Sequence, residues 1–160
     1  MRSYVERERV AHLLELRPGP PATAEKLRAF EDHVGVPLPA AYRAFLEIHD
    51  GYHHLLYPGS FYSIADLLPG GAAHAKVVEW KRMCSDYGNG EVLDGLVVAN
   101  TGQPNNWAYF DPDQVSPQGD PALVSFTPSD SEAFPDLLEF LRNRIAFYEI
   151  VISPDDDGSE

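Results

Sequence analysis

The stretch from Val36 to Gly51 constrains this chain most, because both ends of a helix are marked in it. Pro39 suits the first helical position, where its missing N–H would have no partner and its φ is already helical. Gly51 stands where a helix can end in the left-handed region. Between them, four side chains recur at i, i+3, i+4 and i+7 and so share one face: Tyr42, Phe45, Leu46 and His49. The spacing predicts a short amphipathic helix.

A second amphipathic segment precedes this helix. Thr23 is a candidate N-cap, and apolar residues follow it at i, i+3 and i+7: Leu27, Phe30 and Val34. A Gly-Val-Pro-Leu-Pro corner joins the two segments. We therefore expect two short helices that share a core, on which the rest of the chain builds.

The residues that define these two segments also carry a resemblance. They are Phe30-Glu31, Val34-Gly35, Leu38-Pro39, Tyr42, Phe45-Leu46 and Gly51. Together they resemble the amino-terminal signature of the SUKH superfamily, the SMI/KNR type, which is named after fungal cell-wall regulators and is abundant among bacterial immunity proteins. The resemblance runs from about Leu27 to about Ile145. It implies an α+β fold with two amino-terminal helices, an antiparallel sheet and a carboxy-terminal helix. The shared motif contains no catalytic group.

The remaining pattern agrees with such a fold. Residues 72–87 have a helical period, and three β-rich segments follow with turn-length gaps, at 95–99, 107–110 and 122–126. Strands in such close succession favour an antiparallel meander, because parallel pairs need long crossovers. A final helix is predicted from about Ser131. The expected architecture is an antiparallel sheet with helices on one face, the other face being partly open.

We expect one domain, residues 1–153, because 160 residues suffice for one sizeable core. A Ser-x-x-Glu capping box at Ser3 predicts an extra helix, so that residues 1–17 form a helical extension. A Pro/Gly linker at 18–21 follows it. Residues 154–160 form an acidic tail that we expect to be disordered.

The charge balance restricts the class of partner. With 12 Lys and Arg against 25 Asp and Glu, the formal net charge is −13. Such a surface repels nucleic-acid phosphates, which need cations, and it attracts a basic protein. The alternative is that the acidity serves only solubility. No apolar run approaches the roughly 20 residues of a membrane span, no secretory signal is visible, and Cys84 is the only cysteine. These features favour the cytoplasm.

Four potential metal ligands lie within six residues: His49, Asp50, His53 and His54. An adjacent His-Asp pair is part of one metal-dependent phosphohydrolase signature. However, Gly51 interrupts the helix that would place His49 and His53 on one face. The competing interpretation is a helix end with a histidine near the negative pole of the dipole, followed by a solvated loop. We expect no metal and no other cofactor.

Nucleophile and phosphate-binding motifs are also missing. Cys84 falls on a predicted apolar helix face with Trp80 and Tyr87, which favours a small buried hydrophobe. No Gly-x-Ser-x-Gly elbow and no phosphate loop occur in the sequence. The sequence therefore predicts a protein that is not an enzyme.

Aromatic residues on a predicted strand are candidates for binding a protein partner. Trp107 and Tyr109 alternate with Ala108 and Phe110, so one pair faces the core and the other the open face. Both orientations are open at this point. If the larger pair is outward, it supplies the kind of residue that dominates protein interfaces. The candidate partner-binding residues are Asp50, Tyr52, His53, His54, Tyr62, Asp94, Asn105, Asn106, Trp107 and Tyr109.

Taken with the resemblance, these features predict a non-catalytic protein-binding module. The resemblance implies an immunity protein of a polymorphic toxin system, which neutralises a cognate protein toxin, such as a basic nuclease, by occluding it. Two alternatives remain: a regulatory or scaffolding protein of the SMI/KNR type, and a metal-dependent hydrolase that uses the histidine cluster.

Overall fold

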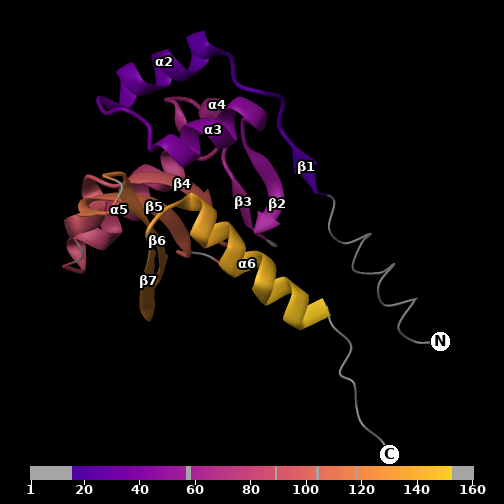
Figure 1. The fold of residues 1–160 in the computed structure, drawn as a ribbon. Coiled ribbons are helices and arrows are strands. Elements are labelled where there is room, and N and C mark those ends of the chain that lie inside the picture. The colour runs from indigo at the N-terminus through magenta and orange to yellow at the C-terminus, as the bar shows by residue number, and fades with distance from the viewer. Residues whose placement is uncertain (1–15, 57–58, 89, 104, 118, 153–160) are drawn as a thin grey trace, which may run out of the picture.

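The computed structural model describes residues 16–56, 59–88, 90–103, 105–117 and 119–152. These residues form an α+β fold (Figure 1). The helices are α2 (Ala24–Val34), α3 (Ala40–Ile48), α4 (Ile64–Leu67), α5 (His74–Asp86), the 3₁₀ helix η1 (Gly90–Leu93) and α6 (Leu137–Ile152). The strands are β1 (Arg17–Pro18), β2 (Tyr52–Leu56), β3 (Gly59–Phe61), β4 (Leu96–Asn100), β5 (Trp107–Val115), β6 (Pro121–Thr127) and β7 (Asp130–Phe134).

These strands make one antiparallel sheet, and they lie in it in chain order from β1 to β7. Between β3 and β4 the chain leaves the sheet, forms α4, α5 and η1, and returns to the next position. The predicted α+β class and the antiparallel meander are confirmed. In Figure 1, α2, α3 and α4 gather above the sheet, α6 runs along it, and α5 stands apart from these helices.

The two amino-terminal helices form for the reasons that the sequence indicates. The Thr23 side chain accepts a hydrogen bond from the Lys26 N–H at 3.2 Å and so caps α2, which ends at Gly35 with φ 77°. Pro39 precedes α3 as its N-cap residue, one position earlier than predicted. The predicted end of α3 at Gly51 is wrong, because the helix ends at Ile48 and its C-cap, His49, has extended backbone. Gly51 is left-handed, with φ 86°, and turns the chain into β2. Its absent Cβ matters, because a Cβ there would lie 2.7 Å from the backbone nitrogen of Ser63.

One face of the sheet, which we call the core face, carries the main core. Its buried strand residues are Leu56, Phe61, Val98, Ala99, Ala108, Phe110, Leu123 and Phe134. They pack against buried residues of four helices: Leu27 and Phe30 of α2, Tyr42 and Leu46 of α3, Ile64 of α4, and Leu137 and Phe140 of α6. Aromatic rings connect the layers, as between Tyr42 and Phe110, whose centroids are 5.4 Å apart. Two amphipathic segments with a shared core were predicted, and the structure places that core here.

The opposite face, which we call the α5 face, is covered as well. Four strand side chains meet Trp80 and Cys84 of α5 and Val92 of η1, namely Val97, Trp107, Tyr109 and Val124. The expected arrangement with helices on one face is therefore incomplete, because α5 adds a third layer over the middle of the sheet. The apolar stripe of α5 is also shorter than predicted: Tyr87, assigned to it, is 83% exposed.

The carboxy-terminal helix begins later than predicted. A helix from about Ser131 is wrong, because residues 130–134 form β7 and pair with β6 along their whole length. The Thr127 hydroxyl accepts from the Asp130 N–H at 3.0 Å and donates to its carbonyl at 2.9 Å, which closes the turn into this hairpin. Asp136 then accepts from the Glu139 N–H at 2.9 Å and caps α6.

The predicted linker at 18–21 is bound to the fold instead. Pro18 belongs to β1, the Gly19 N–H donates to the Gly51 carbonyl at 2.8 Å, and the Asp50 N–H donates to the Pro20 carbonyl at 2.8 Å. The predicted helix from Ser3, apart from its last residue, and the tail at 154–160 lie outside the described residues. Within the described parts of the chain, no helix has both the length and the apolar character that a bilayer crossing requires.

Candidate functional site

A cleft of about 560 Å³ opens on the α5 face, where β3 and β4 end and β5 begins. Helix α5 provides one wall, with Lys76, Glu79, Trp80 and Met83. The sheet side provides the other wall, with Tyr62, Asn100, Asn105 and Trp107. Helix α5 therefore leaves part of this face uncovered, and the cleft is where a ligand or partner could reach it.

Strand pairing brings the sheet-side residues together. Asn100, the last residue of β4, lies opposite Trp107, the first residue of β5. Tyr62 follows β3, and its N–H donates to the Val98 carbonyl of β4 at 2.9 Å. Three neighbouring strands thus place one polar and two aromatic side chains side by side at the same end of the sheet.

The floor of the cleft is aromatic and rigid. The rings of Trp80 and Trp107 lie 5.5 Å apart at 34°, and Tyr62 lies 6.2 Å from Trp107. Trp80 also packs against Tyr109 at 6.0 Å and Phe126 at 5.5 Å. Only 2% of Trp80 and 5% of Trp107 are exposed, so each ring is held from several sides. The indole positions are set before any partner arrives.

The two tryptophans of this floor have indole nitrogens that are unpaired within the described chain. In the described part of the structure, the Nε1 atoms of Trp80 and Trp107 are buried and have no hydrogen-bond partner. A buried donor that lacks an acceptor costs free energy, about 1–3 kcal/mol, and such donors are therefore rare in folded proteins. Both nitrogen atoms lie beneath the surface of the floor, so the polar groups that a ligand can meet are those at the rim of the cleft.

The loop above the floor is fixed by Asn100. Its Oδ1 accepts from the Gly102 N–H at 2.9 Å, and its Nδ2 donates to the Asn106 carbonyl at 3.1 Å. This holds Asn105 in the left-handed region, at φ 67°, a conformation that asparagine tolerates better than most residues. The Asn105 amide is exposed and makes no hydrogen bond to another described residue. Its donor and acceptor are both available at the mouth of the cleft.

The charged and titratable groups of the cleft are few. Lys76 and Glu79, both exposed, form no ion pair within the described residues. Burial raises the pKa of Tyr62 to about 12, with a smaller contribution from the nearby Asp66 carboxylate. The Tyr62 phenol is therefore neutral at physiological pH and can donate a hydrogen bond.

The predicted partner-binding residues divide between this cleft and other places. Tyr62, Asn105 and Trp107 line it, and half-buried Asn106 belongs to its loop. Tyr109 does not reach the surface, since it is 3% exposed and lies beneath Trp80. The two orientations considered for β5 were an outward and an inward aromatic pair. Both pairs are in fact buried, each in the core of its own face.

Asp94 lies outside the cleft. It is exposed beside Gly95, whose carbonyl accepts from the Lys81 ammonium at 2.6 Å. Burial lowers the pKa of Lys81, and the Asp94 carboxylate opposes that shift. The structure thus connects Asp94 with the anchoring of α5 to the sheet rather than with the aromatic floor.

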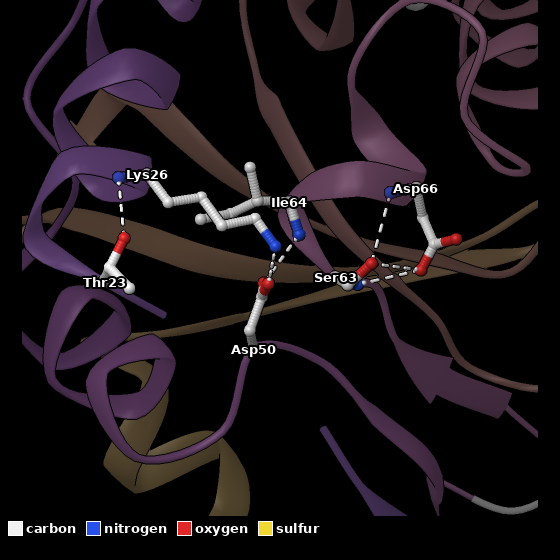
Figure 2. A network of polar contacts seen from close by, with 6 residues as sticks. All are labelled: Thr23, Lys26, Asp50, Ser63, Ile64 and Asp66. Carbon is white, nitrogen blue, oxygen red and sulfur yellow. Dashed lines mark hydrogen bonds and ion pairs between the residues drawn. The ribbon is translucent and has the colours of Figure 1, made fainter. Parts of the chain in front are cut away.

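Asp50 is an internal residue, 4% exposed, and its carboxylate is already engaged (Figure 2). One oxygen forms an ion pair with Lys26 of α2, and the other accepts from the Ile64 N–H at 2.7 Å, at the start of α4. Figure 2 shows these groups converging beside the Ser63–Asp66 capping box. Asp50 joins α2, the end of α3 and α4, which leaves it unavailable for surface contact.

The remaining predicted residues lie on β2, beyond β3 from the cleft. Tyr52 is half-buried on the core face and meets the ring of His49 edge-on at 5.3 Å. His53 is exposed opposite Arg17, and half-buried His54, with φ 62°, donates its N–H to Ser60 Oγ at 3.0 Å. No group of three or more His, Cys, Asp or Glu side chains is placed to hold a metal ion in the described residues. His49, Asp50, His53 and His54 therefore do not form such a group.

Sequence reasoning missed five of the residues that line the cleft: Lys76, Glu79, Trp80, Met83 and Asn100. Trp80 was correctly placed on the apolar stripe of α5, but a stripe does not show where its edge stays uncovered. Lys76 and Glu79 lie beside that stripe, and the only signal was their position, Lys76 one turn before Trp80 and Glu79 directly before it.

Comparison with known proteins agrees with this architecture. No curated protein matches the chain. The family model described as SMI1 / KNR4 family (SUKH-1) matches residues 21–147, which include the sheet from β2 to β7, helices α2 to α5 and most of α6. This chain therefore belongs to the SMI1 / KNR4 family (SUKH-1).

Proposed function

We propose that this chain is a non-catalytic immunity protein, which binds a cognate protein toxin in the cytoplasm of the producing cell and blocks its active site. Membership of the SUKH-1 family supports an interaction role of this kind. The observation that carries the proposal is the cleft of the α5 face, a preformed hollow in which the exposed side chains of Lys76, Glu79 and Asn105 surround an aromatic floor. Such surfaces are typical of protein interfaces.

Charge supports the choice of partner. The net charge of −13 attracts a basic protein over long range and raises its association rate. A basic nuclease toxin fits this requirement, because its own substrate is anionic. The proposed mechanism has two parts: carboxylates steer the toxin, and the cleft anchors it so that substrate cannot enter.

The test is direct binding. A candidate toxin encoded beside this chain is co-expressed with it, the complex is isolated, and toxin activity is measured with and without the chain. We expect a stoichiometric complex, loss of toxin activity, and affinity that weakens as salt rises, since exposed charges are screened over about 8 Å at physiological ionic strength. A complex with an endogenous regulatory protein and with no toxin would favour the scaffolding alternative and would contradict the proposal.

A matched pair of variants locates the surface. Glu79→Arg reverses a charge at the cleft, and Glu25→Arg makes the same change on the exposed side of α2. We expect Glu79→Arg to weaken the complex clearly more than Glu25→Arg, although both change the net charge equally. Equal weakening would show that only overall charge matters, and that the toxin contacts another surface.

A further inference from the structure

We propose that Asp130 and Glu132 prevent the outer edge of the sheet from pairing with a second copy of this chain. Both residues belong to β7, the last strand in the order of the sheet. Their role is separate from that of the cleft of the α5 face and does not depend on which partner binds there.

The two edges of the sheet differ in how well they can accept another strand. At one edge, β1 has only two residues, and one of them, Pro18, has no N–H to donate. At the other edge, β7 has five residues without a proline, and it pairs with β6 in one continuous register. Residues 130–133 are all exposed. A regular, exposed edge strand is a template for another chain unless charge or irregularity prevents the pairing.

One outward-pointing N–H group of β7 already has an acceptor. The Asp130 N–H donates to Thr127 Oγ1 at 3.0 Å within the hairpin, so the Asp130 backbone faces β6. Backbone groups alternate in direction along a strand, so the N–H groups of Ser131 and Ala133 point away from β6. Asp130 Oδ1 accepts from the Ser131 N–H at 2.8 Å. An incoming strand would have to displace this carboxylate before it could pair with Ser131.

Glu132 places a second carboxylate along the same edge. Asp130 and Glu132 lie on the same face of the strand as Phe134, which is buried in the core face. Glu132 forms no ion pair with another described residue. Arg144 of α6 donates instead to Ser125 Oγ at 3.1 Å, on the β6 residue opposite Glu132. The edge therefore presents a carboxylate that no nearby cation pairs with in the described chain.

Like charges meet when two copies of β7 pair antiparallel about a two-fold axis. Because Ser131 and Ala133 carry the outward backbone groups, even-numbered residues of one copy lie opposite even-numbered residues of the other. In the central register Glu132 lies opposite Glu132 of the second copy. In the two neighbouring registers Asp130 lies opposite either Glu132 or Asp136 of the second copy. Like charges directly opposite each other destabilise a strand pair, so none of these registers is favourable.

Three double variants of the full chain test the two carboxylates, and each removes two negative charges. Asp130→Ala with Glu132→Thr removes both charges and the acceptor of the Ser131 N–H. Asp130→Asn with Glu132→Thr removes the same charges but keeps an oxygen that can accept from Ser131. Glu25→Gln with Asp32→Asn, on the exposed side of α2, is the matched control for net charge.

Sedimentation velocity at neutral pH and physiological salt measures the oligomeric state. We expect the unchanged chain and the α2 control to stay monomeric up to about 1 mM, and Asp130→Ala with Glu132→Thr to form a dimer within this range. The variant with Asp130→Asn should dimerise about tenfold more weakly, because each copy keeps one outward N–H occupied. Thermal unfolding of each variant confirms that it is folded. If the double variant with Asp130→Ala does not fold, Glu132→Thr alone is measured, and a weaker dimer is expected.

A further substitution locates the contact. Ala133→Pro removes an outward N–H and leaves the hydrogen bonds between β7 and β6 in place. Added to Asp130→Ala with Glu132→Thr, it should restore the monomer.

Four results would overturn the inference. They are a folded Asp130→Ala, Glu132→Thr variant that stays monomeric; equal dimerisation of the α2 control, which would show that only net charge matters; a dimer that survives Ala133→Pro and so uses another surface; or a dimer of the unchanged chain that Ala133→Pro abolishes. None of them affects the proposed immunity function, whose test is binding of a toxin.

Discussion

The aromatic residues of the two faces of the sheet differ in what adjoins them. On the core face, rings such as Phe61 and Phe140 are enclosed mainly by apolar neighbours, although the Arg144 guanidinium lies 5.1 Å from the centroid of Phe140 and the buried Tyr42 hydroxyl has no partner in the described residues. On the α5 face, Trp80 and Trp107 are almost as buried, but a cleft adjoins them and their indole N–H groups have no partner within the described chain. Burial by itself therefore does not distinguish the aromatic residues of the two faces, and what sets Trp80 and Trp107 apart is the cleft that adjoins them.

The comparison of the two faces fails if residues of the core face contribute little to the free energy of unfolding. Phe61→Ala removes a ring that is fully buried between Phe45, at 5.1 Å, and Phe140, at 6.2 Å. We expect the free energy of unfolding to fall by about 3–5 kcal/mol, because the lost contacts leave a cavity. Urea unfolding measures it. A loss below about 1 kcal/mol would mean that the core face repacks freely.

The next largest loss of stability is expected from Asp50, whose carboxylate joins α2, the end of α3 and α4. Asp50→Ala leaves the Ile64 N–H without its acceptor and Lys26 without its counter-ion. Because Lys26 is partly exposed and can turn to water, we expect about 2 kcal/mol of destabilisation, mainly from the Ile64 N–H. Lys26→Met tests the division: it keeps the Ile64 bond and should cost less. A larger loss for Lys26→Met would contradict this assignment.

On the α5 face, the raised pKa of Tyr62 should make stability depend on pH in the alkaline range. The pKa of Tyr62 is raised from 10.0 to about 12, so the unfolded chain loses this proton first as pH rises. The folded state then binds more protons than the unfolded state, and stability falls between pH 10 and about 12. Tyr62→Phe should make this part of the stability curve less steep, and the remaining slope comes from Tyr42 on the core face, whose pKa burial also raises. Ultraviolet titration of tyrosinate in the two proteins measures the missing ionisation, and an unchanged curve would refute the assignment.

The smallest effect concerns the surface of the helical layer. Glu31 accepts from Arg43 at 2.6 Å and from the Leu38 N–H at 3.1 Å, and these bonds, that with Arg43 first, lower its pKa below 4.5. A lowered carboxyl pKa contributes stability above pH 4.5, which is lost as pH falls through the folded value. Glu31→Gln should therefore reduce stability slightly at pH 7 and hardly at all near pH 2. A constant difference across this range would argue against the ion pair.

The sequence alone determined the helical framework and the order of strands. Thr23 and Gly35 act through their own backbone geometry and hydrogen bonds, so both ends of α2 follow from local chemistry. Helix α3 instead ends at Ile48, with His49 as its C-cap, before the predicted stop at Gly51. The stripe of α5 and the strands β4 to β6 likewise follow from side-chain period. The net negative charge and the family resemblance can also be read from the sequence alone.

Tertiary structure decided the features that depend on contacts between residues distant in the sequence. Ser131 is a good helix N-cap by itself, but residues 130–134 pair with the backbone of β6 and form a strand instead. Asp50 is adjacent to histidines in sequence, but its carboxylate is turned inward by Lys26 and Ile64, which are distant along the chain. The cleft lies beside α5, which packs over Tyr109 and Trp107 and leaves a hollow along its edge. Such coverage is a property of packed layers, and no local pattern encodes it.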